Sequence, residues 1–143
     1  MRIFLPNVIT AEEAKILRET NIKKGEAREI VEEIKRIIDT VSFHINWKTP
    51  SYIRIEEKTS GHKWHIDTGG PYGSEGHMTW CNLGCSLLLT DDEDAGYLEY
   101  RDGTKLLPKE HFCGLAIHSS DIEHKVSKNK TRVALLLFLQ RKH

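Results

Sequence analysis

The hydrophobic pattern of this chain changes its period near residue 40, and this change limits the fold that the chain can adopt. Apolar residues recur at helical spacing between Ile30 and Ile38 with charged residues between them. This spacing predicts an amphipathic helix over about 26–40. Upstream, Thr10 and Glu13 form a Thr-x-x-Glu capping box, a signature of a helix start. The first 40 residues as a whole are therefore expected to be helical.

After residue 40 the pattern becomes that of short strands separated by turn residues. Helices followed by many short strands indicate an α+β fold that is mainly β, with a helical cover. Strands this short and this numerous suit a double-sheet jelly roll. We expect a single domain, with 1–41 as the helical cover and 42–143 as the jelly-roll core. The strand candidates are 42–47, 52–56, 78–90, 97–100, 105–107, 112–117, 124–126 and 132–140.

Composition excludes several classes of protein. Lysine plus arginine and aspartate plus glutamate number 21 each, so the formal net charge is zero, which argues against broad binding to nucleic acid or anionic membranes. The longest strongly apolar run, 133–139, is too short to span a bilayer. No signal peptide is evident. The three cysteines, Cys81, Cys85 and Cys113, form no framework pattern, so reduced thiols and a cytoplasmic location are expected.

The strongest chemical signal is His65-Ile66-Asp67, followed by His124 57 residues after the aspartate. Residues i and i+2 of a strand point to the same face, so His65 and Asp67 would project together. Two imidazoles and one carboxylate form the ligand set of a mononuclear non-haem Fe(II) site with open coordination positions. A structural zinc site would more often use cysteine thiolates. The alternative is two polar residues at a strand edge that face solvent.

Arg132 stands eight residues after His124, at the start of an apolar strand. A guanidinium makes bidentate, charge-assisted contacts to a carboxylate, so Arg132 is the candidate anchor for an anionic co-substrate. Alternation would place it on the same face as Ala134, Leu136 and Phe138. Two alternatives stay open: a solvated arginine at a strand start, or Lys130 as the anchor.

Three segments together resemble the 2-oxoglutarate/Fe(II)-dependent oxygenase superfamily, in its prolyl 4-hydroxylase-like branch. They are HKWHIDTG, CSLLLTDDEDAGYLEY and IEHKVSKNKTRVALLLFL, and the resemblance covers roughly 51–140. It implies a double-stranded β-helix, Fe(II) held by His65, Asp67 and His124, and 2-oxoglutarate held by Arg132. Two features depart from the pattern. The spacing from His124 to Arg132 is slightly short, and alanine stands before Gly96 where the family commonly has a second glycine.

The resemblance also implies an activity. The chain would be a dioxygenase that uses O2 and 2-oxoglutarate to hydroxylate an unactivated C–H bond, with succinate and carbon dioxide as co-products and ascorbate as a candidate stimulant. A prolyl or other residue in a peptide or protein is the expected substrate. The alternatives are a small metabolite or a nucleic-acid base, a non-enzymatic metal-binding jelly roll, and a zinc hydrolase with Glu75 or His62 as its base. The sequence leaves the oligomeric state open.

Further residues are candidates for contacts around this site. The resemblance suggests Tyr52 as a second contact for 2-oxoglutarate, although its distance from His65 is not the usual one and packing is the alternative. Trp64, His62 and His77 are candidate substrate contacts, against packing for the tryptophan and solvated loops for the histidines. The loops 58–63 and 68–77 are candidate lids. His118 is expected to end a strand or to support a ligand.

Overall fold

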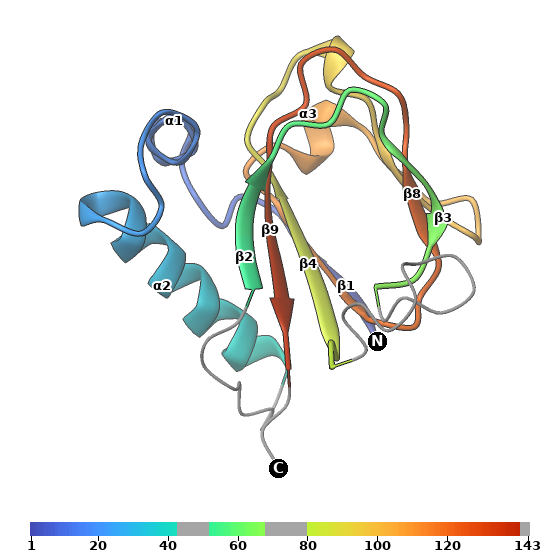
Figure 1. Ribbon diagram of the computed structural model, residues 1–143, viewed down its shortest axis with the longest axis horizontal. Helices are drawn as coiled ribbons and strands as arrows, with labels where there is room; N and C mark the ends of the chain where they lie inside the picture. Colours follow the sequence, from blue (N-terminus) through green and yellow to red (C-terminus); the bar gives the residue numbers. More distant parts are fainter. Residues whose placement is uncertain (43–51, 68–79, 141–143) are drawn as a thin grey trace.

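The computed structural model describes residues 1–42, 52–67 and 80–140. Two antiparallel sheets lie face to face, and the two N-terminal helices lie on the far side of the larger sheet (Figure 1). The larger sheet has the order β1 (Arg2–Leu5), β7 (Leu115–Ser119), β4 (Leu83–Leu88), β9 (Ala134–Leu139) and β2 (Tyr52–Glu56). The smaller sheet has the order β3 (His62–His65), β8 (His124–Val126), β5 (Leu98–Tyr100) and β6 (Lys105–Leu106). The strand expected at 42–47 lies almost wholly outside the described residues.

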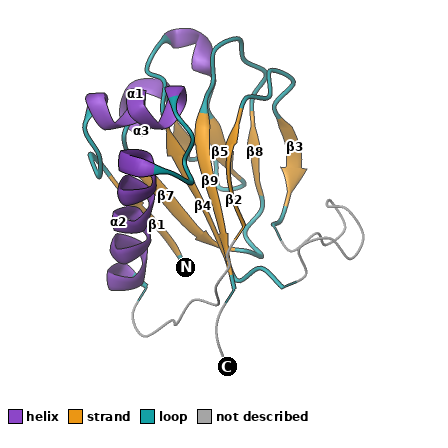
Figure 2. Cartoon of the chain, turned by 60° about the vertical axis from the view of Figure 1, so that its left-hand side comes forward, coloured by secondary structure: helices purple, strands orange, loops and turns teal. Residues whose placement is uncertain are grey.

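Two N-terminal helices form the cover that the sequence predicted. Helix α1 (Ala11–Glu19) begins at the expected capping box, in which the backbone nitrogen of Glu13 donates to Thr10 Oγ1 at 3.1 Å. Helix α2 (Gly25–Val41) buries one apolar stripe against the larger sheet (Figure 2). None of the described helices combines the length and the apolar character needed to cross a membrane.

The prediction that the first 40 residues are helical is wrong at the N-terminus. Residues 2–5 form β1, which pairs with β7 at the edge of the larger sheet. The open edge of the larger sheet supplies backbone hydrogen-bond partners for these residues. The candidate strand 112–117 is also shifted, because a short helix, α3 (Pro108–His111), precedes it and β7 begins only at Leu115. A 3-10 turn, η1 (Glu93–Ala95), occupies the acidic run before β5.

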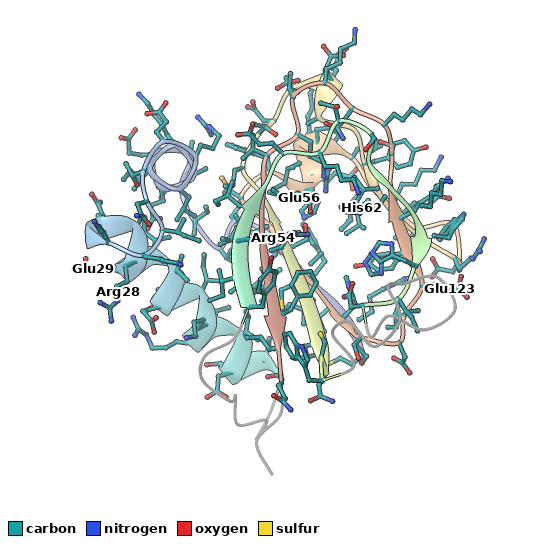
Figure 3. The ribbon with its side chains drawn as sticks, in the orientation of Figure 1. Arg28, Glu29, Arg54, Glu56, His62 and Glu123 are labelled. Atoms are coloured by element: carbon teal, nitrogen blue, oxygen red, sulfur yellow. The ribbon has the colours of Figure 1, made fainter. Side chains whose placement is uncertain are left out.

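Strand β9 separates the hydrophobic core from the functional cavity. Leu135, Leu137 and Leu139 pack into the core between the larger sheet and the helices. Ala134, Leu136 and Phe138 face the opposite way, as strand alternation requires, and line a cavity of about 890 Å³. Polar side chains from both sheets project into the same space, as Figure 3 shows for Arg54, Glu56 and His62.

Candidate metal centre and cavity

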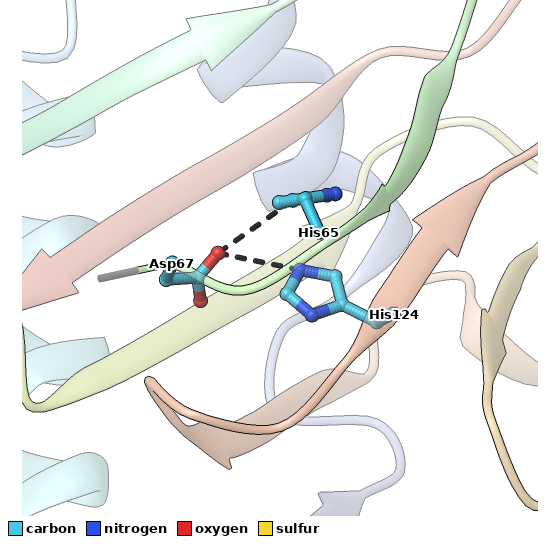
Figure 4. Close-up of side chains that lie close together, drawn as sticks. All are labelled: His65, Asp67 and His124. Atoms are coloured by element: carbon cyan, nitrogen blue, oxygen red, sulfur yellow. Dashed lines mark ion pairs between the residues drawn. The ribbon is translucent and has the colours of Figure 1, made fainter. Parts of the chain in front are cut away.

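His65, Asp67 and His124 converge at one end of the smaller sheet (Figure 4). His65 ends β3 and His124 begins β8, and the two residues are paired across the strands with ring centroids 4.2 Å apart. Asp67 follows two residues later, where its backbone nitrogen donates to the carbonyl oxygen of Ser120 at 2.9 Å. One ligand atom from each residue lies within 4.8 Å of the other two. The spacing of His65 and Asp67 therefore brings both side chains to the same place, as expected.

Hydrogen bonds at Nδ1 select the tautomer of both neutral imidazoles. Nδ1 of His65 donates to the carbonyl oxygen of Lys63 at 2.7 Å, and Nδ1 of His124 donates to that of Ile122 at 2.9 Å. In each neutral ring Nε2 then carries a lone pair. These atoms lie 3.7 and 3.3 Å from Asp67 Oδ1. Three electron-rich atoms that face one another fit a divalent cation such as Fe(II).

A histidine and a tyrosine outside the triad hold the other carboxylate oxygen of Asp67. Nε2 of His118, on β7, donates to Asp67 Oδ2 at 2.8 Å, and the Tyr100 hydroxyl donates to His118 Nδ1 at 3.1 Å. Burial alone would raise the pKa of Asp67, but the hydrogen bond from His118 and the close approach of the His124 imidazole outweigh it and hold that pKa well below its usual value. His118 thus orients the carboxylate and leaves Oδ1 free for a metal. Metal ligands are commonly oriented by such hydrogen bonds.

Gly84, on β4, makes room for this hydrogen bond. A Cβ atom at this position would overlap Asp67 Oδ2 and would lie 2.9 Å from His118 Nε2. Gly84 is also the register partner of His118. Gly84 is not among the residues expected from the sequence to form the site, although a glycine inside an otherwise apolar strand often marks a close approach of another group.

Arg132 lies buried at the other end of the cavity, with 6% of its surface exposed. Nη1 donates to the carbonyl oxygen of Ala95 at 3.2 Å, whereas Nη2 is buried without a hydrogen-bond partner among the described residues. Burial lowers its pKa to about 10, so the side chain remains a cation at neutral pH. Lys130, the competing anchor, is exposed. A buried guanidinium with an unpaired donor fits an anionic group in the cavity.

The other candidate residues are dispersed. Tyr52 lines the cavity, packs against the Phe138 ring and is 46% exposed. His62 begins β3 rather than lying in a loop, and also lines the cavity. Trp64 does not line it, because its ring packs beneath the Arg101 guanidinium, 4.0 Å from the ring centre. His77, Glu75 and the loop 68–77 lie outside the described residues.

Buried histidines make the stability of the metal-free protein depend on pH. Burial lowers the pKa of His65 to about 4, with a further contribution from His124, and it lowers the pKa of His111 to about 3. Unfolded histidines titrate near 6.5, so the unfolded state binds more protons below that pH. We expect the free energy of unfolding to fall between about pH 6.5 and 4, by up to about 1.4 kcal/mol per pH unit for each such histidine.

Urea unfolding at a series of pH values measures this decline. His111→Gln is the matched variant, because glutamine can still donate to the Ser86 carbonyl oxygen that His111 Nε2 contacts at 2.9 Å but does not titrate. The decline should be shallower in this variant. An equal slope in both proteins would contradict the assignment of His111 as a buried neutral histidine.

No family model matches the sequence, and no curated protein matches it. Solved structures do match. A Pseudomonas putida prolyl-4-hydroxylase is 13% identical at a TM-score of 0.67, covering 99% of this chain and 85% of that one. The viral collagen prolyl hydroxylase of Paramecium bursaria Chlorella virus-1, solved as a 2OG complex, is 10% identical at 0.72, covering 99% and 96%.

A third match is the non-heme alpha ketoglutarate dependent carbocyclase from nogalamycin biosynthesis, 14% identical at a TM-score of 0.65, covering 98% of this chain and 79% of that one. The chain therefore shares the fold of these three structures, two prolyl hydroxylases and one non-heme alpha ketoglutarate dependent carbocyclase. The similarity expected from the motifs is therefore confirmed at the level of the fold. Sequence identities this low do not assign a substrate.

Proposed function

We propose that this chain is an Fe(II)- and 2-oxoglutarate-dependent dioxygenase that hydroxylates an unactivated C–H bond. One observation carries the proposal: the triad and the buried, incompletely paired Arg132 line the same cavity. A metal site alone fits many functions, and a buried arginine alone fits many anions. Together they suit a co-substrate that chelates a metal at one end and carries a carboxylate at the other. We also propose that the two sheets form a double-stranded β-helix.

Each residue has a definite role in this proposal. His65 Nε2, His124 Nε2 and Asp67 Oδ1 would hold Fe(II), and Arg132 would hold the distal carboxylate of 2-oxoglutarate. Iron bound there would supply the activation of O2, and 2-oxoglutarate would be converted to succinate and carbon dioxide as the substrate is hydroxylated. His118 keeps the Asp67 carboxylate oriented. Apolar side chains, including Leu98, Val126 and Leu136, line part of this space and would limit the access of water to it once substrates are bound.

A prolyl or other residue in a peptide or protein is the proposed substrate. Two of the matching structures are prolyl hydroxylases, which favours this class. Tyr52 and Phe138 provide an aromatic surface at the end of the cavity away from Arg132, suited to an apolar ring. A small metabolite is the second candidate, because the matching carbocyclase belongs to a biosynthetic process. The zero net charge disfavours nucleic acid, and a cytoplasmic location is proposed.

The test is iron-dependent formation of succinate from 2-oxoglutarate, measured with ascorbate present. His65→Ala or Asp67→Ala should lower iron binding and succinate formation by about 100-fold or more, since each removes a direct ligand. Asp121→Ala is the matched control, because it removes an exposed carboxylate three residues from His124. Wild-type protein that binds no iron and forms no succinate would overturn the proposal. Turnover with zinc instead of iron would favour a hydrolase.

A further inference from the structure

A carboxylate occupies the cavity between the positive groups. Glu56 is the only acidic residue besides Asp67 among the described residues that line the cavity. Oε1 accepts a hydrogen bond from His62 Nε2 at 2.5 Å, and Oε2 accepts one from Arg54 Nη2 at 2.6 Å. Its side chain is 16% exposed. Figure 3 shows Glu56 and Arg54 projecting from β2 and His62 facing them from β3.

Strand register places this group between Arg132 and the metal triad. On one wall, Glu56 pairs with Ala134, and Arg132 precedes Ala134 by two residues on the same face, about 7 Å along the strand. On the other wall, His62 pairs with Val126, whereas His65 pairs with His124 further along both strands. The Glu56–His62 contact therefore joins the two sheets at an intermediate level. A molecule that extends from the triad to Arg132 passes beside it.

The negative charge of Glu56 acts both on the Arg132 side chain and on any anion that binds beside Arg132. It interacts favourably with the Arg132 cation, and it repels any anion that takes up position beside Arg132. His62 and Arg54 occupy both of its oxygens and reduce this repulsion. On the basis of the proposed function, we propose that Glu56 is a specificity-determining residue that weakens the binding of the dicarboxylate co-substrate. Turnover would then follow the concentration of 2-oxoglutarate rather than saturate at low levels.

Calorimetric binding to oxygen-free, Mn(II)-loaded protein tests this inference. Glu56→Gln keeps the shape of the side chain and removes its charge, so it should tighten 2-oxoglutarate binding by about fivefold to tenfold. Binding of 2-oxobutyrate, which lacks the distal carboxylate, should change by less than about twofold, because no charge is then placed beside Glu56. A purely structural role would affect both acids alike. Glu57→Gln is the matched control, since Glu57 is exposed and does not line the cavity.

A second variant tests the part played by His62. His62→Ala removes a donor from Glu56 and should weaken 2-oxoglutarate binding by about fivefold, a typical effect of one lost charge-assisted hydrogen bond. The double variant Glu56→Gln/His62→Ala should bind 2-oxoglutarate as Glu56→Gln does, because His62 then has no charge to offset.

The outcomes separate this inference from the proposed function. If the wild type binds both acids and Glu56→Gln fails to tighten 2-oxoglutarate selectively, Glu56 does not determine specificity, and the proposed function still stands. If neither the wild type nor Glu56→Gln binds 2-oxoglutarate although both bind Mn(II), both proposals fail. Binding by Glu56→Gln but not by the wild type would support the inference in its strongest form.

Discussion

Replacing Arg132 with methionine is expected to abolish 2-oxoglutarate binding and at the same time to stabilise the metal-free protein. Arg132 is buried, and its Nη2 has no partner among the described residues, so folding removes a charged donor from water without full compensation. Methionine fills a similar volume without that cost, so the free energy of unfolding should rise by about 1–2 kcal/mol. Loss of the proposed contact between the guanidinium and the distal carboxylate should raise the Kd for 2-oxoglutarate by about 100-fold or more.

Urea unfolding measures the first effect, and calorimetry on Mn(II)-loaded protein measures the second. Lys130→Met is the control, because Lys130 is an exposed cation two residues away and should change neither quantity appreciably. The assignment of Arg132 as the anchor would be wrong if Arg132→Met bound 2-oxoglutarate as the wild type does. A strongly destabilised variant would instead show that the contacts of Arg132 with the Ala95 carbonyl oxygen and the Glu56 carboxylate outweigh the cost of burying the cation.

Gly84→Ala is expected to destroy the metal centre through a single added methyl group. The new Cβ would overlap the Asp67 oxygen that His118 holds, so the carboxylate must leave its position. Metal affinity should fall by about 100-fold. This is the upper end of the loss that is usual when a group that orients a metal ligand is mutated. Iron binding by the purified variant measures this loss, and Gly84→Ala protein with wild-type affinity would contradict the proposed role of the close approach.

The same substitution should also cost folding stability, by about 1–3 kcal/mol as is usual for overpacking a buried site. A double-mutant cycle locates the cause. In an Asp67→Ala background the methyl group no longer meets a carboxylate, so Gly84→Ala should cost clearly less there than in the wild type. Equal costs in both backgrounds would place the strain at another neighbour of the methyl group, such as His118 Nε2.

The parts of this protein that the sequence predicts well are those set by local periodicity. Helical spacing predicts α2, and the capping box predicts the start of α1. Alternation along 132–140 places Arg132 beside the apolar side chains that line the cavity, but Lys130 has the same parity, so only the structure distinguishes the two. Likewise, the i, i+2 relation of His65 and Asp67 brings their side chains together without any knowledge of the fold.

The parts that sequence reasoning missed depend on which strands become neighbours. Residues 2–5 form a strand only because β7 offers an open edge. Gly84 matters because its register partner is His118, and His118 in turn meets an aspartate 51 residues away. Glu56 faces His62 because β2 and β3 belong to different sheets that meet across the cavity. No local pattern contains these relations.

Strand β9 has a consequence for how such a chain can change over generations. One face of this strand holds the core and the other continues the line of Arg132. Deleting a single residue between Arg132 and the end of the strand would exchange the two faces beyond that point, putting leucines of the core into the cavity. Insertions and deletions within this strand should therefore disrupt both the hydrophobic core and the cavity. We expect differences in length among related chains to be confined to the loops.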